Sequence, residues 1–179
     1  HTCTYGALGA FSTGIGSTDA AAVYKTQKLW FRVPETYKFN ISGDLQKGVY
    51  SKDLILHIIK EMTSDGATYK SCEFHGDAIK KMSVDARMTI TNMAVEMGAK
   101  NGVIEPDPAI ATYINKHRRG KTSDMNFRHL KSDGEYEEEF VFEINELEPQ
   151  IACPHTVDNV CGVSEIQGHE IDQAFIGTC

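Results

Sequence analysis

The chain has 179 residues, enough for one ordinary domain or for one small domain with parts of others. Hydrophobic residues make up 41% of it, close to the average of globular proteins, so we expect a real apolar core. The formal net charge of −7 at pH 7 argues against a dedicated nucleic-acid binder, because such proteins present a basic face. We find no apolar run long enough to cross a membrane and nothing resembling a signal peptide, so the expected location is the cytoplasm.

The pattern of apolar residues predicts helices and strands that alternate irregularly. We expect helices at about 19–25, 52–62, 84–97 and 109–117. We expect strands at 37–42, 67–74, 102–105, 138–144 and 173–176. An extended segment is predicted at 29–34, and a polar surface loop at 118–134. This mixture indicates layers of the α/β or α+β kind.

Some of these elements carry clear end signals. Ser51 and Ser83 are predicted N-caps, and Gly98 is the predicted left-handed C-cap of the helix at 84–97. The helix after Ser51 has one apolar stripe, formed by Leu54, Ile55, Ile58, Ile59 and Met62. Apolar and other residues alternate along the predicted strand at 138–144, so one of its faces is apolar. The acidic run at 135–139 is expected to lie at a solvated edge.

The cysteines give little support for a disulfide framework or a self-contained zinc site. They are odd in number, widely spaced and without a C-x-x-C pair: Cys3, Cys72, Cys153, Cys161 and Cys179. Reduced thiols are the simplest interpretation.

The two ends of the chain are unusual for a complete protein. The sequence begins with His1 inside a glycine-rich stretch, without an initiator methionine, and stops at Cys179 directly after a Gly-Thr turn. The glycines match neither the dinucleotide-binding fingerprint nor a phosphate-binding loop. We therefore interpret the sequence as an internal piece of a longer protein.

Four residues are candidates for chemistry, and the pattern alone leaves each of them open. Asn92 and Glu96 lie four apart on one predicted helix, so they share a face, and periodicity favours a solvent-exposed Glu96. His1 is either an uninformative terminus or a proton or hydrogen-bond donor to a substrate. Cys179 follows a predicted strand, where ligands are often placed, yet a lone cysteine is more often a small buried hydrophobe.

Four segments together resemble one known family. They are HTCTYGALGAFSTGIGSTD at 1–19, KLWFRVPE at 28–35, TNMAVEMGA at 91–99 and DQAFIGTC at 172–179. Their order and spacing resemble the aconitase superfamily of hydro-lyases, and in detail the large subunits of its 3-isopropylmalate dehydratase and homoaconitase branch. The resemblance covers essentially the whole chain.

The resemblance implies a fold and a division into domains. The fold should be α/β, as part of an aconitase-type three-layer αβα arrangement. Residues 1–34 would end a first domain, residues 35–148 would form a second, and residues 149–179 would begin a third.

The resemblance also implies a cofactor and a reaction. Enzymes of this family carry a [4Fe–4S] cluster on three cysteines, and Cys179 matches the first of them; the other two lie outside this sequence. The open iron acts as a Lewis acid that eases the departure of hydroxide. The implied reaction isomerises 3-isopropylmalate and 2-isopropylmalate by dehydration and rehydration, and the homocitrate and homoisocitrate pair of homoaconitase is the alternative.

Roles for the remaining candidates follow from the same resemblance. His1 matches a histidine that pairs with a helix glutamate, Glu96 matches that glutamate, and Asn92 matches an asparagine beside the cluster. The implied partners are a separate small subunit and a small hydroxy-acid substrate, with no nucleic acid and no membrane. The piece alone is expected to be inactive. Two rival interpretations are a cluster-free relative that binds RNA and a purely structural domain. The acidic net charge argues against the first of them.

Overall fold

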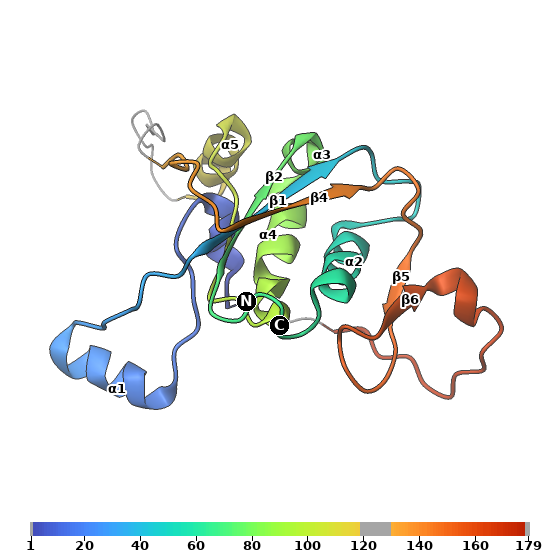
Figure 1. Cartoon of the computed structure of the whole chain (residues 1–179), viewed down its shortest axis with the longest axis horizontal. Helices are drawn as coiled ribbons and strands as arrows, with labels where there is room; N and C mark the ends of the chain where they lie inside the picture. The colour runs from blue at the N-terminus through green and yellow to red at the C-terminus, as the bar shows by residue number, and fades with distance from the viewer. Residues whose placement is uncertain (1, 119–129, 178–179) are drawn as a thin grey trace.

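The computed structural model describes residues 2–118 and 130–177, and its centre is a parallel sheet of four strands (Figure 1). The strands are β1 (Thr36–Ser42), β2 (Ser71–His75), β3 (Asn101–Val103) and β4 (Glu138–Glu143). Their order across the sheet is β3-β2-β1-β4. The predicted α/β class is confirmed, and the sheet with its helices is consistent with part of an aconitase-type three-layer fold.

Parallel neighbours need crossover connections, and helices supply them here. Helix α2 (Ser51–Met62) lies between β1 and β2 in the chain, while α3 (Asp77–Lys81) and α4 (Val84–Met93) lie between β2 and β3. The predicted apolar stripe of α2 is buried and belongs to one core cluster with Phe39 and Phe74 of the sheet. The stripe therefore faces the sheet.

Stacked aromatic rings join the three longest strands. The ring of Phe39 on β1 lies 5.2 Å from that of Phe74 on β2 and 5.1 Å from that of Phe140 on β4, measured between centroids. The strand register places Phe39 opposite both residues, so the stack follows directly from parallel pairing. Phe39 is completely buried.

The helix ends agree with the predictions in part. Ser83 is the N-cap of α4, with its Oγ accepting a hydrogen bond from the amide of Ala86 at 3.2 Å. Gly98 adopts φ 82° and ends the short 3-10 helix η2 (Ala94–Met97), into which α4 tightens. The prediction that Ser51 caps α2 was wrong by one residue. Tyr50 is the N-cap, because the Asp53 carboxylate accepts a hydrogen bond from its amide at 2.7 Å.

Several smaller elements surround this centre. Helix α1 (Ser17–Thr26) was predicted; it has no buried residue and lies well apart from the sheet in Figure 1. Helix α5 (Pro108–His117) was also predicted and is capped by Asp107. Four features were not predicted: the short helix α3, the 3-10 helices η1 (Thr4–Leu8) and η3 (Val163–Ile166), and the antiparallel hairpin of β5 (Gln150–Ala152) and β6 (Val160–Gly162).

Two strand predictions need correction. Residues 173–176 form no strand, and Phe175 and Ile176 in them are exposed, so apolar character alone misled the prediction where no neighbouring strand is present. The strand predicted at 67–74 begins only at Ser71, because residues before it form turns. Most of the loop predicted at 118–134 lies outside the described residues. Across the part of the chain that the structure describes, no helix has both the length and the apolar character to cross a membrane.

The aromatic stack predicts a large energetic difference between two positions of the sheet. Replacing Phe39 by Ala should lower the free energy of unfolding by about 3–5 kcal/mol, because it opens a cavity between three strands. The matched control is Val141→Ala on β4, whose side chain is 70% exposed and where we expect a change of about 0.5 kcal/mol or less. Urea unfolding followed by circular dichroism measures both, and equal losses would contradict this view of the core.

Candidate functional site

The segment that directly follows His1 packs against the sheet and α4. Gly6 lies so close to β3 that a Cβ atom on it would stand 1.7 Å from the carbonyl oxygen of Gly102. The amide of Ile104 donates a hydrogen bond to the Gly6 carbonyl at 3.0 Å. Only glycine permits this approach of two backbones, so the glycine-rich sequence has a definite structural purpose here.

This packing brings the N-terminal segment to Asn92. Thr4 Oγ1 donates a hydrogen bond to Asn92 Oδ1 at 3.3 Å, and Thr91 Oγ1 donates to the Thr4 carbonyl at 3.3 Å. Asn92 is half-buried. Residues 88 positions apart in sequence are thus in direct contact at one end of α4.

Glu96 follows Asn92 along the same helical stretch, in η2, and is exposed. Within the described residues it makes no hydrogen bond and no ion pair. The solvent-exposed position that periodicity favoured is therefore observed. His1 lies outside the described residues, so its pairing with Glu96 remains a prediction, and the same holds for Cys179 as a cluster ligand.

We asked whether the described residues could hold a metal by themselves. Among residues 2–118 and 130–177, no three His, Cys, Asp or Glu side chains are grouped as a metal site requires. Cys3 and Cys72 are fully buried, and burial raises the pKa of both thiols. These two cysteines are core residues, and any cluster needs ligands from outside the described part.

Sequence reasoning missed a buried ion pair beside the sheet. Arg87 of α4 is fully buried; its Nη2 lies 2.7 Å from Asp107 Oδ2 and donates to the carbonyl of Lys80 at 3.0 Å. Burial by itself raises the pKa of Asp107, but the guanidinium outweighs this and holds it below its ordinary value. Arg87 Nε and Nη1 are buried and have no hydrogen-bond partner among the described residues. The available signal was the helical spacing that puts Arg87 on the same face as the buried Val84 and Ile90.

A cavity of about 300 Å³ opens next to this pair, at the carboxyl ends of β1, β2 and β3. Ligands of open α/β sheets often bind at such ends. The cavity is lined by residues of both charges: the basic Lys80 and Arg87, and the acidic Asp77, Glu105 and Asp107. Because neither sign predominates, the cavity by itself does not define a class of ligand.

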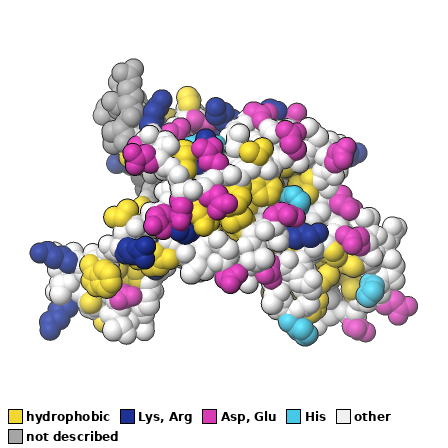
Figure 2. Space-filling model, viewed as in Figure 1, with side chains coloured by type: hydrophobic (Ala, Val, Ile, Leu, Met, Phe, Trp, Pro, Cys, Tyr) yellow, Lys and Arg dark blue, Asp and Glu magenta, His cyan; other side chains and the backbone are white. Residues whose placement is uncertain are grey.

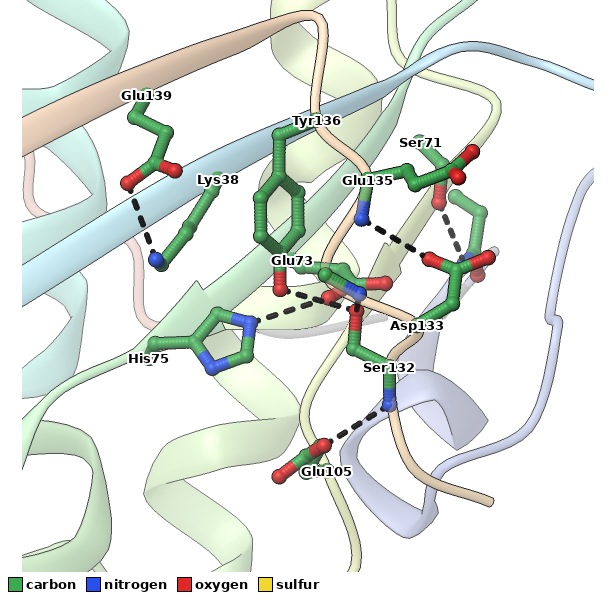
Figure 3. A network of polar contacts seen from close by, with 12 residues as sticks. Lys38, Ser71, Glu73, His75, Glu105, Ser132, Asp133, Glu135, Tyr136 and Glu139 are labelled. Atoms are coloured by element: carbon green, nitrogen blue, oxygen red, sulfur yellow. Dashed lines mark hydrogen bonds and ion pairs between the residues drawn. The ribbon is translucent and has the colours of Figure 1, made fainter. Parts of the chain in front are cut away.

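A second polar cluster, also not foreseen, lies beside β2 (Figure 3). His75 Nε2 lies 3.0 Å from Glu73 Oε2, and the hydroxyls of Ser132 and Tyr136 are 2.9 Å apart. The amide of Ser132 donates to Glu105 Oε1 at 2.9 Å. The Ser132–Glu105 hydrogen bond and the edge-to-face contact of the Tyr136 and His75 rings hold the segment before β4 against the sheet, so the cluster has a clear structural role.

Glu73 is the electrostatic centre of that cluster. Burial by itself raises the pKa of this carboxyl, but hydrogen bonds from His75, Ser132 and Tyr136 outweigh it and leave the pKa below its ordinary 4.5. A carboxyl whose pKa is lowered by folding stabilises the folded state in its charged form.

Comparison with known proteins extends this picture. A family model described as the aconitase family (aconitate hydratase) matches residues 1–179. The chain belongs to the aconitase family. This assignment covers every residue from which the resemblance was drawn, including the three segments that contain His1, Asn92 with Glu96, and Cys179.

Individual relatives are similar over the whole chain. A probable 3-isopropylmalate dehydratase large subunit of Methanothermobacter thermautotrophicus is 53% identical over all of this chain and 42% of its own length. A probable methanogen homoaconitase large subunit of the same organism is 52% identical over all of this chain and 41% of its own length. A 3-isopropylmalate dehydratase large subunit of Thermotoga maritima is 50% identical, with 43% of its length covered. The chain thus spans less than half of the relatives it matches.

The backbone contact at Gly6 predicts a position-specific effect of a single methyl group. Gly6→Ala should push the segment at 2–12 away from β3, because its Cβ would overlap the Gly102 carbonyl. Hydrogen exchange of the Ile104 amide should then accelerate about tenfold or more. Gly16→Ala is the matched control, since its Cβ would meet only ordinary contact distances. If both variants exchange like the parent protein, the close packing is not present in solution.

The lowered pKa of Glu73 predicts a pH-dependent contribution to stability. Glu73→Gln should lower the free energy of unfolding by about 1.5–3 kcal/mol at roughly pH 7, where the carboxylate is charged. The difference from wild type should disappear as the pH falls below the ordinary 4.5 of a glutamate and through the lowered folded-state pKa. Urea titrations at several pH values measure this, with exposed Glu138→Gln as the control. A loss of stability that is independent of pH would contradict the electrostatic explanation.

Proposed function

We propose that the protein containing this chain is the large subunit of a hydro-lyase of the 3-isopropylmalate dehydratase type. The observation that carries the proposal is the identity of about half of all residues, over the whole chain, to large subunits with that name. Because the chain spans less than half of those relatives, the activity belongs to the whole protein. Substrate isomerisation would proceed by dehydration and rehydration.

Within this proposal, the end of α4 and the following η2 carry Asn92 and Glu96, and the N-terminal segment carries His1. Glu96 orients His1 as a positioning residue, His1 donates a proton or a hydrogen bond to the leaving oxygen, and Asn92 supports the site. The Thr4–Asn92 hydrogen bond supports this assignment, because it anchors the segment directly after His1 on the helix that carries Asn92. Glu96 lies at the next turn of the same stretch and has a free carboxylate among the described residues.

The proposed cofactor is a [4Fe–4S] cluster with Cys179 as one ligand. The described residues do not provide a binding site for it, so the remaining ligands would come from the rest of the protein. When bound, such a cluster supplies a Lewis-acidic iron with an open coordination position.

We further propose a small subunit as partner, a small hydroxy-acid as substrate and the cytoplasm as location. Relatives named as large subunits support the partner.

We also propose the division into domains at 1–34, 35–148 and 149–179. In support of the first boundary, Tyr24 and Trp30 are 88% and 85% exposed, which suits packing against a preceding part of the protein. Figure 2 shows apolar and basic side chains together on the part of the molecule that contains α1, which projects from the sheet.

Homoaconitase is the second candidate of the same reaction class. Its named relative is almost as similar as the dehydratase, 52% against 53%, so identity alone does not separate the substrates. No described residue favours homoaconitate, and more of the similar relatives carry the dehydratase name.

Activity of the full-length protein with its small subunit tests the proposal. We expect isomerisation of 3-isopropylmalate, and a fall in kcat of about 10²–10⁴-fold on replacement of Glu96 by Gln, because proton transfer is impaired. As Glu96 acts by favouring the charged form of His1, the basic limb of the kcat/KM profile should move to lower pH in the variant. Conversion of homocitrate but not of isopropylmalate would instead assign the homoaconitase function.

The matched control is Glu61→Gln, which removes an exposed carboxylate on α2 and should leave kcat unchanged. If Glu96→Gln has full activity and an unaltered pH profile, Glu96 has no part in the reaction. If neither substrate is converted by the iron-reconstituted complex, the proposed function itself is wrong.

A further inference from the structure

The β5–β6 hairpin places two thiols side by side. Cys153 directly follows β5 and Cys161 lies in β6, and their Sγ atoms are 3.5 Å apart. Both thiols are free and half-buried. We propose that Cys153 and Cys161 are a thiol modification site, at which small-molecule disulfides of the glutathione type form a reversible intramolecular cross-link.

The hairpin register explains why the two sulfur atoms meet. Ile151 is paired with Cys161 and Ala152 with Val160, and the Cys153 amide donates to the Asn159 carbonyl at 2.7 Å. Cys153 and Cys161 are therefore diagonal neighbours on one face of the ladder. Their sulfur atoms stand only about 1.5 Å farther apart than in a disulfide bond.

Contacts to α2 and to the turn that follows it fix the hairpin that carries the pair. Asp53 Oδ1 accepts a hydrogen bond from the Gln150 amide at 2.8 Å, at the start of β5. Asp158 Oδ2 accepts one from the Ser64 amide at 2.9 Å, in the connecting loop. Val160 is 5% exposed and belongs to the core. Because the backbone is held on both sides, the effective concentration of one thiol at the other is high.

The surroundings favour a disulfide over a metal site. No third His, Cys, Asp or Glu joins the two thiols in a group that could bind a metal, as far as the described residues extend. Cys3 and Cys72 are fully buried and closed to a dissolved oxidant. Neither thiol of the pair is Cys179, so the cross-link does not consume the proposed cluster ligand.

The chemistry is two successive thiol–disulfide exchanges. One thiol of the pair loses its proton to solvent and attacks a sulfur atom of the small disulfide, whose S–S bond breaks and releases one thiolate. The second thiol, likewise deprotonated, attacks the mixed disulfide and releases the other half of the oxidant. Two electrons pass from the pair to the oxidant, which takes up the two protons and leaves as two thiols.

The arrangement of aspartates allows a direct test on the full-length protein. The protein is equilibrated with oxidised and reduced glutathione, free thiols are alkylated, and a protease that cuts before aspartate is added. Cleavage before Asp133, Asp158 and Asp172 puts Cys153 on residues 133–157 and Cys161 on residues 158–171, while Cys179 lies on a third peptide. We expect the first two peptides to be joined, to separate on reduction, and to exceed the mixed glutathione disulfide about tenfold or more.

Single substitutions complete the test. Cys161→Ser should abolish the joined peptides and leave glutathione trapped on Cys153, and Cys153→Ser should trap it on Cys161. Cys179→Ser is the matched control and should retain the joined peptides. Joined peptides that persist without Cys161, glutathione adducts without cross-linking in the wild type, or no reaction of either thiol would each overturn the proposal.

Discussion

The parallel pairing of β1 with a strand on either side is the constraint on which the rest of the structure depends. β1 pairs with β2 on one edge and with β4 on the other, and its Phe39 is completely buried between aromatic rings from both neighbours. Parallel pairing requires crossover segments, which places α2 and α4 on the apolar face. The polar residues of the alternate positions, among them Lys38 and Glu73, then come to the other face. There Lys38 binds Glu139 across the sheet at 3.0 Å, as Figure 3 shows.

The candidate site depends on this sheet through a single narrow contact. Gly6 can approach the Gly102 carbonyl only because it has no side chain, and that approach brings Thr4 to Asn92. The glycine-rich start of the chain therefore packs its backbone directly against β3, and this backbone packing brings the candidate site residues close together. The ion pair of buried Arg87 with half-buried Asp107 joins α4 to the start of α5 in the same region. Removal of Asp107 alone would leave the charge of Arg87 uncompensated in the interior.

The periodicity of the sequence predicted the four longer helices α1, α2, α4 and α5 and most strands, because an apolar stripe or an alternation is a local property. It succeeded for α2, whose stripe is buried, and for β1 and β4. It failed at residues 173–176, where an apolar run has no adjacent strand, and at the cap of α2, where Asp53 decides the first turn. The short β5–β6 hairpin was missed because three-residue strands carry too little pattern to be recognised.

The sequence by itself determined the family, the α/β class and the candidate residues Asn92, Glu96, His1 and Cys179, since residue type and spacing are written in it directly. Only the tertiary structure decided the strand order, the contact of Thr4 with Asn92, the burial of Arg87 and the meeting of Cys153 with Cys161. The physical reason is that these features arise from packing between segments, in several cases almost a hundred residues apart. No local pattern specifies which distant surfaces will share the core.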